Sequence, residues 1–173
     1  MDSIDKLLRR AKALKKGFAA GEAEALARVR AVLPQAGALR HADALHVIAR
    51  EAGFDSWPKL KFAAEATAMD RAAKAERLKI ALYFGQHWVV EALLAETPDL
   101  GRENFGLAYA LYDRANVAQV LARDPEAAVR RVGPRSPILH LAFSRHIHGA
   151  GTARDMLAVA EALLAAGADV NDT

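Results

Sequence analysis

Histidine is the residue type in this chain whose spacing could support metal chemistry. The sequence contains six histidines; one residue separates His146 from His148, and His140 lies a short distance before them. Three imidazoles can hold Zn²⁺ and leave a fourth coordination position open for water. No carboxylate is spaced to complete such a site, and Gly149 and Gly151 follow the histidine pair. We therefore interpret His146 and His148 as solvated loop residues, and we predict no metal site.

Motifs of catalytic chemistry are the next feature to consider. The sequence has no Gly-x-Ser-x-Gly phrase, no glycine-rich phosphate-binding loop and no pair of acids in a recognisable frame. We therefore expect a protein that is not an enzyme, with no catalytic residue, no cofactor and no small-molecule substrate.

Cysteine is absent from all 173 residues, which excludes a disulfide framework and a thiolate metal site. The N-terminal residues alternate Leu with Lys and Arg, so they lack the uninterrupted apolar stretch of a signal peptide. No run approaches the roughly 20 apolar residues that span a bilayer. Together these features predict a soluble, cytoplasmic protein.

The composition favours helices. Hydrophobic residues make up 53% of the chain and aromatic residues only 6%, so the apolar residues are chiefly Ala, Leu and Val. Such residues suit helices that pack at close range. No alternating stretch of Val, Ile and Thr is long enough to form a strand. We predict an all-α fold.

The first predicted helix, residues 4–18, is amphipathic and basic, with its apolar side chains in one sector of the helical wheel. Residues 1–80 hold 16 Lys and Arg against 10 Asp and Glu, whereas residues 81–173 hold 8 against 11. Such a helix can bind nucleic acid or an anionic membrane, or it can present a solvated face while its leucines pack. Both alternatives stay open; the basic side chains are Lys6, Arg9, Arg10, Lys12, Lys15 and Lys16.

Three more helices are predicted in the N-terminal part, at about residues 22–33, at about residues 41–52 and from Pro58 onward. Phe54 and Trp57 lie on either side of the turn that precedes the last of these helices. We interpret both as core anchors, because large aromatic side chains at such a turn usually bury apolar area. A ligand-stacking role for Trp57 is the alternative.

A repeated pattern occupies the second part of the chain. The spacing of one helix pair, with a glycine between the helices, is marked by Leu78, Ala81, Gly85, Val90 and Leu93. We expect Leu93 to face the core. Moving 27 positions on, the apolar places of this pattern are taken, without the glycine, by Phe105, Ala108, Val117, Val120 and Leu121.

Two phrases near the C-terminal end are the most specific. Residues 136–142 read Ser-Pro-Ile-Leu-His-Leu-Ala, and residues 160–171 read Ala-Glu-Ala-Leu-Leu-Ala-Ala-Gly-Ala-Asp-Val-Asn. This part of the chain resembles an ankyrin repeat, a unit of roughly 33 residues in which a turn precedes two short antiparallel helices. Residues 39–61 are similar to a helical leader that precedes ankyrin repeats in many bacterial proteins.

The resemblance implies a short ankyrin-type solenoid of about three helix pairs, capped by an N-terminal four-helix segment. The leader is residues 1–76, and we expect it to pack with the repeats as one continuous unit. The third repeat has one extra residue between Pro137 and His140, and roughly ten extra residues, 145–154, between its helices. His140 takes the position of the family's turn-bridging histidine. The degenerate repeats are residues 77–103, 104–132 and 133–173.

The family implies binding, so we expect a non-catalytic protein–protein interaction module, a scaffold or a regulator, with an unknown protein partner. Trp88 is added to the predicted surface because its place in the second helix is normally polar and exposed. The turn tips are expected near residues 102–103 and 131–135. The family's variable positions on the concave side correspond to Tyr83, Phe84, Ala110, Leu111, Ser144 and Arg145.

Three alternatives to this binding surface stay open. In the first, the leader or the insertion at residues 145–154 folds over the aromatic side chains. In the second, the protein is a nucleic-acid or anionic-membrane adaptor that uses its basic N-terminal helix. In the third, it is an accessory part of a larger enzyme, because the sequence stops where a further turn would ordinarily begin.

Overall fold

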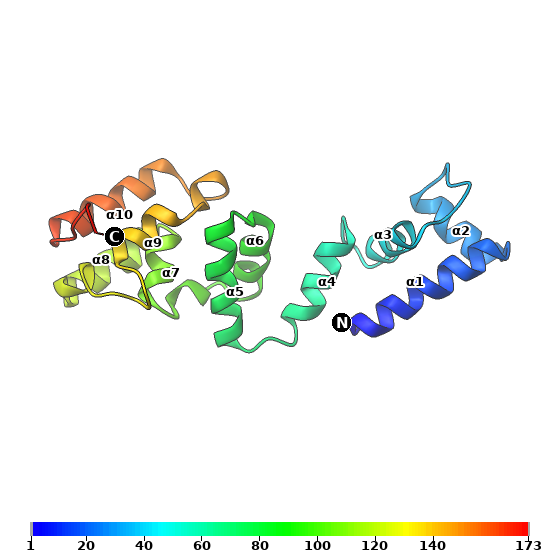
Figure 1. The fold of residues 1–173 in the computed structure, drawn as a ribbon, viewed down its shortest axis with the longest axis horizontal. Helices are drawn as coiled ribbons and strands as arrows, with labels where there is room; N and C mark the ends of the chain where they lie inside the picture. The colour runs from blue at the N-terminus through cyan, green and yellow to red at the C-terminus, as the bar shows by residue number, and fades with distance from the viewer. Residues whose placement is uncertain (1, 173) are drawn as a thin grey trace. The chain divides into compact units, whose positions relative to one another are not determined.

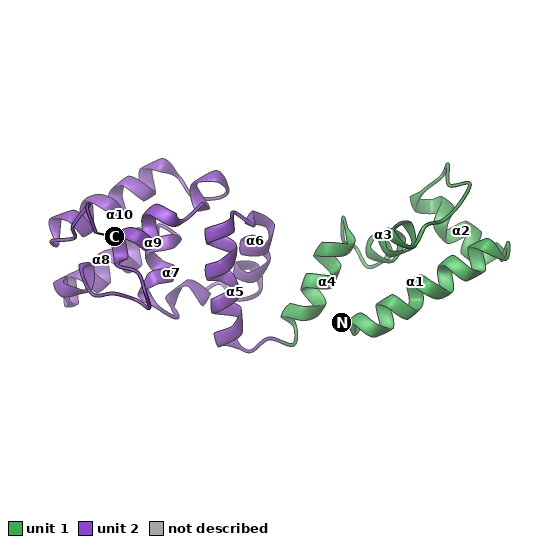
Figure 2. Ribbon diagram, viewed as in Figure 1, with its two compact units in different colours: residues 1–68 green, residues 69–173 purple. Residues whose placement is uncertain are grey.

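In the computed structural model the chain is all-α, as the composition predicts (Figure 1). The structure describes residues 2–172, and these form ten α-helices and three short 3-10 helices, with no strand among them. The chain divides into two compact units, unit 1 (residues 1–68) and unit 2 (residues 69–173), which Figure 2 shows in different colours. Within the described part of the chain, no helix is long and apolar enough to cross a membrane.

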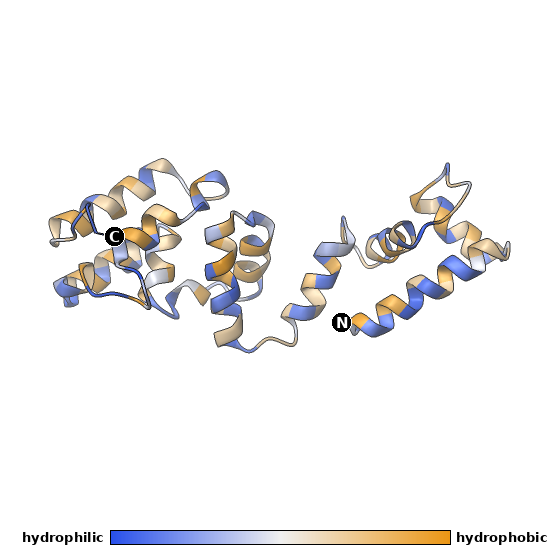
Figure 3. Cartoon of the chain, viewed as in Figure 1, coloured by the Kyte–Doolittle hydropathy of each residue, from blue (hydrophilic) through white to orange (hydrophobic). Residues whose placement is uncertain are grey.

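Unit 1 contains the four helices that the sequence predicts. The helix α1 begins after Ser3, because the Ser3 hydroxyl accepts a hydrogen bond from the backbone N–H of Lys6. Polar and apolar residues alternate along α1 in Figure 3, and the apolar side contacts α2 and α3. The four helices are α1 (Ile4–Ala19), α2 (Ala23–Val32), α3 (His41–Glu51) and α4 (Trp57–Ala66).

The core of unit 1 draws side chains from all four helices. Phe54 and Trp57 pack against it, which confirms their interpretation as core anchors. The chain folds back at Phe54, whose N–H donates to the backbone oxygen of Ala49 at 2.9 Å. The large buried side chains of this core are Leu7, Leu14, Val29, Leu39, Val47, Ile48 and Leu60.

Unit 2 is built from three consecutive pairs of helices. The pairs are α5 (Arg71–Phe84) with α6 (His87–Glu96), α7 (Phe105–Ala110) with α8 (Arg114–Arg123), and α9 (Pro137–Phe143) with α10 (Ala153–Ala165). The first helices of the pairs contact in the order α5, α7, α9, and α8 contacts α10. The 3-10 helices in the connections are η1 (Leu100–Arg102), η2 (Pro125–Ala128) and η3 (His146–His148).

The start of unit 2 is set by a helix cap. The carboxylate of Asp70 accepts a hydrogen bond from the N–H of Ala73 at 2.8 Å, so α5 begins at Arg71. The boundary that the sequence suggests, after residue 76, falls inside α5. The packing of leader and repeats as one continuous unit stays a prediction.

The turns inside the first two helix pairs share one backbone conformation. Gly85 ends α5 with φ 68° and ψ 33°, in the left-handed region that glycine enters without strain. Tyr112, 27 positions further on, adopts φ 56°, and no other described residue besides glycine has a positive φ. The geometry of the turn is therefore repeated although the glycine is not.

The core of unit 2 confirms the expected orientation of Leu93, which has 0% of its surface exposed. The last two helix pairs share a core that includes Tyr109, whose hydroxyl donates to the backbone oxygen of Ala127 at 3.1 Å. The other large buried side chains of this shared core are Tyr112, Val117, Leu141, Val159 and Leu163.

Candidate functional site

Two adjacent aromatic side chains project from the last turn of α5. Tyr83 is 38% exposed and Phe84 is 63% exposed. Their rings pack edge to face, with centroids 5.0 Å apart and an interplanar angle of 88°. Phe143, the last residue of α9 and 49% exposed, brings a third ring to 6.2 Å from the ring of Tyr83. We call these three residues the aromatic strip.

A cation lies over two rings of the aromatic strip. The guanidinium carbon of Arg135 is 4.7 Å from the ring centroid of Tyr83 and 5.0 Å from that of Phe143. Both distances are within the about 6 Å at which a ring face attracts a cation. The turn that carries Arg135 is closed by a hydrogen bond of 2.8 Å from the N–H of Val132 to the backbone oxygen of Arg135.

His140 fastens this turn to α9, as the sequence predicts. Its Nε2 donates to the backbone oxygen of Val132 at 2.9 Å. Burial lowers the pKa of His140; the hydrogen bond to Val132 opposes this shift, and the charges of Arg135 and Lys79 add to it. The imidazole is therefore neutral in neutral solution, and its one N–H holds the turn.

Buried hydrogen bonds join the first helices beside the strip. The Ser144 hydroxyl donates to the backbone oxygen of Ala110 at 2.6 Å, and the N–H of Arg145 donates to the backbone oxygen of Leu82 at 2.9 Å. The end of α9 is thereby tied to both α7 and α5. Ala110 and Ser144 are only 6% and 8% exposed, so these two predicted surface residues support the strip and offer a partner little area.

The other predicted surface residues differ in exposure. Tyr83, Phe84 and Arg145 are exposed, whereas Leu111 and Trp88 are half-buried. Trp88 lies in the first turn of α6, so it is not on one of the first helices that form the strip. The structure thus brings together two of the predicted aromatic residues and separates Trp88 from them by the turn at Gly85.

Phe143 is the site residue that the sequence analysis missed. The extra residue placed between Pro137 and His140 moved the predicted positions of the third repeat to Ser144 and Arg145. Without that extra residue, the positions that correspond to Tyr83 and Phe84 in the third repeat would be Phe143 and Ser144. The spacing therefore allowed Phe143 to be predicted, but the register chosen for the third repeat excluded it.

The insertion at residues 145–154 packs against turns and leaves the strip open. A Cβ atom at Gly149 would lie 2.6 Å from Nδ1 of His87, and one at Gly151 would lie 2.9 Å from Cδ2 of Tyr112. These contacts place the insertion beside the turns that follow α5 and α7. Since Tyr83 and Phe84 stay exposed, the alternative in which this insertion covers them is wrong.

Positive charge near the strip is only partly neutralised. Lys79 lines the same small hollow as Tyr83, Phe143 and Arg135, and its ammonium pairs with the carboxylate of Glu76 at 2.6 Å. Neither Arg135 nor the exposed Arg145 forms an ion pair with a carboxylate of residues 2–172. Two guanidinium groups are therefore available for a negatively charged group of a partner.

The histidines considered for zinc binding differ in their surroundings. His140 and His146 are buried, and His148 is exposed. Burial lowers the pKa of His146, and the nearby His87 lowers it further. Among the described residues, no three His, Cys, Asp or Glu side chains are grouped so that they could hold a metal ion. The interpretation of His146 as a solvated loop residue is wrong, because its ring packs 5.5 Å from that of Tyr112.

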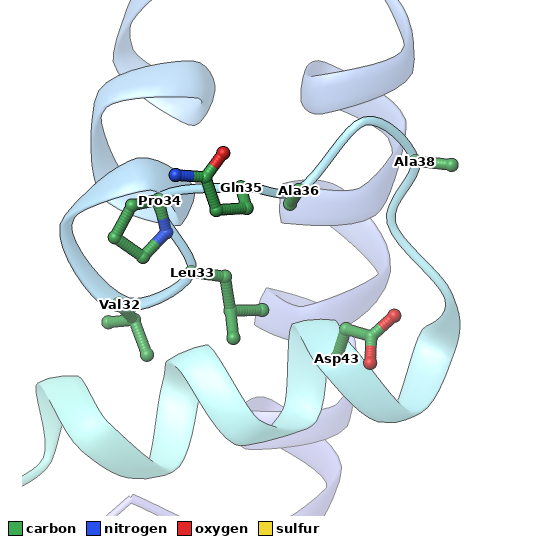
Figure 4. Close-up of a pocket in the computed structure, with 7 residues that line it drawn as sticks. All are labelled: Val32, Leu33, Pro34, Gln35, Ala36, Ala38 and Asp43. Atoms are coloured by element: carbon green, nitrogen blue, oxygen red, sulfur yellow. The ribbon is translucent and has the colours of Figure 1, made fainter.

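A pocket in unit 1 offers no free catalytic group. It lies where the end of α2, the following loop and the start of α3 meet (Figure 4). Its one charged side chain, Asp43, accepts hydrogen bonds from the backbone N–H of Arg40 at 2.9 Å and from Nε of Arg40 at 3.1 Å. Asp43 thus serves as a helix cap. The lining residues are Val32, Leu33, Pro34, Gln35, Ala36, Ala38 and Asp43.

The basic face of α1 is partly paired within unit 1. Asp2 pairs with Lys6 at 2.8 Å and with Arg10 at 3.1 Å, and Arg10 also lies 3.6 Å from Glu51. The hydrogen bond from Lys6 lowers the pKa of Asp2. The exposed basic side chains of α1 without a carboxylate partner among the described residues are Arg9, Lys12, Lys15 and Lys16; Arg9 donates to the backbone oxygen of Asp5.

Comparison with known proteins assigns no family to the chain. No family model, no curated protein and no solved structure matches the chain. The functional argument therefore depends on the residues of the chain itself.

Proposed function

We propose that unit 2 is a short ankyrin-type solenoid that acts as a non-catalytic protein-interaction module, a scaffold or a regulator. Three features support the proposal. The helices occur in three consecutive pairs whose first helices are neighbours. A left-handed residue stands at the same repeat position in the first two pairs. His140 bridges the turn before the third pair. Ankyrin-type units stack in this way and bind partners on an extended face.

The observation that carries the proposal is the exposed aromatic strip. Tyr83, Phe84 and Phe143 are exposed by 38%, 63% and 49%, and the three rings come from α5 and α9, the first helices of the first and third pairs. Exposed apolar side chains are common singly, but a contiguous group marks an interaction surface. Aromatic residues and Arg also dominate the energetic centres of protein interfaces. Arg135 supplies such an arginine beside the rings.

Capture of partner proteins from the native cell extract tests this function. The bait is the full chain, compared with a Tyr83→Ala/Phe84→Ala variant whose fold is checked by circular dichroism. We expect a reproducible set of proteins to be lost from the variant. Leu157→Ala on α10 is the control, since Leu157 is exposed by 55% and lies outside the strip. If parent and double variant capture the same proteins in equal amounts, the strip is not the binding site.

A second candidate function is an adaptor that binds nucleic acid or an anionic membrane through α1. The supporting observation is the group Lys12, Lys15 and Lys16, which are exposed and lack a carboxylate partner in residues 2–172. Binding of duplex DNA and of acidic vesicles at low salt, measured for the full chain, tests it. A triple change of these lysines to Gln should abolish binding. Absence of binding by the parent chain would remove this candidate.

A further inference from the structure

The arginines beside the aromatic strip indicate which kind of partner the surface fits. We propose that the strip, together with Arg135 and Arg145, binds an acidic peptide segment: a stretch of a partner protein in which Asp or Glu lies next to a bulky apolar side chain. This inference rests on the proposed function of unit 2. It adds the chemical class of the partner and the role of each side chain in recognising it.

Arg135 is prepared to receive a carboxylate. Its guanidinium lies over the rings of Tyr83 and Phe143, 4.7 Å and 5.0 Å from their centroids. The group is half-buried and held by the rings, and none of its N–H groups donates to a protein atom of the described chain. A guanidinium carries a planar fork of donors that matches the two oxygens of a carboxylate. Since the ring contacts do not use these donors, Arg135 can engage an acidic side chain without losing a bond.

Arg145 supplies a second positive charge beside the turn at Gly85, the residue that follows Phe84. Its backbone is fixed by the hydrogen bond of 2.9 Å to Leu82. Its Cδ packs beside the turn, where a Cβ atom at Gly85 would lie 3.2 Å away. The guanidinium end of this exposed side chain has no carboxylate partner among the described residues. One arginine thus lies over the aromatic strip and a second lies beside the turn that follows Phe84, the most exposed member of the strip.

The charge of the whole unit favours a local acidic segment over a polyanion. Residues 69–173 hold 12 Lys and Arg against 13 Asp and Glu, so the arginines of the strip do not belong to a broad basic field. Nucleic acid binding requires many phosphate contacts on a basic face. Single-stranded nucleic acid also needs free ring faces for stacking. Arg135 already lies over one face of Tyr83 and one of Phe143.

Peptide selection on the full chain tests the inference. A display library of short random peptides is selected against the immobilised protein, and the recovered peptides are measured by fluorescence anisotropy. We expect sequences that combine Asp or Glu with Phe, Leu, Ile or Trp. Arg135→Gln should weaken their binding roughly tenfold, and Arg135→Lys should recover part of it, because the charge returns without the fork. Arg123→Gln, an exposed arginine on α8, is the matched control and should leave binding unchanged.

The outcomes separate this inference from the proposed function. Selected peptides that require Phe84 but show no acidic preference would overturn the acidic partner and leave the interaction module intact. Peptides that bind Phe84→Ser as tightly as the parent would overturn the strip itself, as would the recovery of no peptide. A labelled single-stranded oligonucleotide is tested in parallel. Tight binding of this oligonucleotide that depends on Arg135 would replace the acidic peptide by nucleic acid.

Discussion

The hydroxyl of Tyr112 donates a hydrogen bond to the backbone oxygen of Ser144, 3.2 Å away, and this bond links the turn after α7 to the end of α9. Tyr112 is 3% exposed and its ring packs against that of His146. The left-handed backbone of Tyr112 is unfavourable for a residue with a Cβ atom. His146 and Gly151 of the insertion between α9 and α10 thus lie against the side chain of Tyr112, which stands where the first helix pair has its turn glycine.

Two small substitutions at Tyr112 reveal the backbone strain. Tyr112→Ala and Tyr112→Gly both remove the buried ring, and each should lose several kcal/mol of unfolding free energy. The glycine variant should nevertheless be more stable than the alanine variant by about 1 kcal/mol, because glycine adopts a positive φ without strain. Urea unfolding followed by circular dichroism measures the difference. An alanine variant as stable as the glycine variant would show that the turn is not left-handed in solution.

Removal of the Tyr112 hydroxyl tests its bond to Ser144. Tyr112→Phe keeps the ring and the backbone and deletes one buried hydrogen bond. We expect a loss of about 1 kcal/mol in the free energy of unfolding. Tyr83→Phe is the control, since Tyr83 is exposed and its hydroxyl can bond to water. Equal stabilities of Tyr112→Phe and the parent would contradict the structural role of this bond.

The helices of the chain were predictable because their signals are local. Capping residues and apolar spacing place α1, α2 and α3 close to their observed bounds, and Gly85 marks the turn between α5 and α6, but α5 begins at Arg71, before the predicted start of the repeats at residue 77. Phe54 and Trp57 were recognised as core residues for the same reason. The helix pair on either side of Tyr112 was also predicted, because its apolar positions repeat those of the first pair after 27 residues.

The arrangement at the aromatic strip was only partly predictable, because it depends on contacts between residues distant in sequence. Arg135 lies over Tyr83, and Ser144 bonds to Ala110. No local sequence pattern predicts either contact. Phe143 was missed because one extra residue in the third repeat makes two registers equally consistent with the spacing. His146 was mistaken for a solvated loop residue, since Tyr112, whose ring packs against it, lies in another helix pair.

Leu93 offers a direct test of the core of unit 2. Its side chain has 0% of its surface exposed. Leu93→Ala should lower the free energy of unfolding by about 2 to 5 kcal/mol, through lost burial and the cavity that remains. Leu157→Ala is the control, because Leu157 is exposed by 55% and should change stability by less than about 0.5 kcal/mol. Chemical denaturation of both variants gives the comparison, and a near-zero loss for Leu93→Ala would refute the assigned packing.

Stability should fall in mild acid because two buried histidines must take up protons on unfolding. Folding lowers the pKa of both His140 and His146 below the ordinary value of 6.5. Between the two pKa values the unfolded chain binds more protons than the folded chain, so the free energy of unfolding decreases as the pH falls through this range. The stability that depends on neutral His140 and His146 is fully present well above pH 6.5. This part of the free energy of unfolding is lost as the pH drops through the lowered pKa values of the folded chain.

His146→Phe separates this effect from general acid instability. Phenylalanine keeps a ring beside Tyr112 but cannot take up a proton, so the variant should lose less stability than the parent between neutral pH and pH values just below 6. His148→Asn is the control, since His148 is exposed. Thermal melting at a series of pH values above the carboxylate range provides the data. Parallel curves for the parent and His146→Phe would argue against a depressed pKa at His146.

The last prediction concerns Arg28 and Glu51, which join α2 to α3 in unit 1. Nε and Nη2 of Arg28 each donate to a carboxylate oxygen of Glu51 at 2.8 Å, and Arg10 from α1 approaches the same carboxylate at 3.6 Å. The hydrogen bond that Arg28 donates to Glu51 raises the pKa of Arg28. Because the pair is bidentate and part of a network, we expect Glu51→Gln to cost about 1 kcal/mol, near the upper end for surface ion pairs. The loss should shrink in concentrated salt, which screens exposed charges. Glu161→Gln on α10, an exposed residue outside this network, is the control, and an equal effect of both changes on urea unfolding would show that the Glu51 pair adds nothing specific.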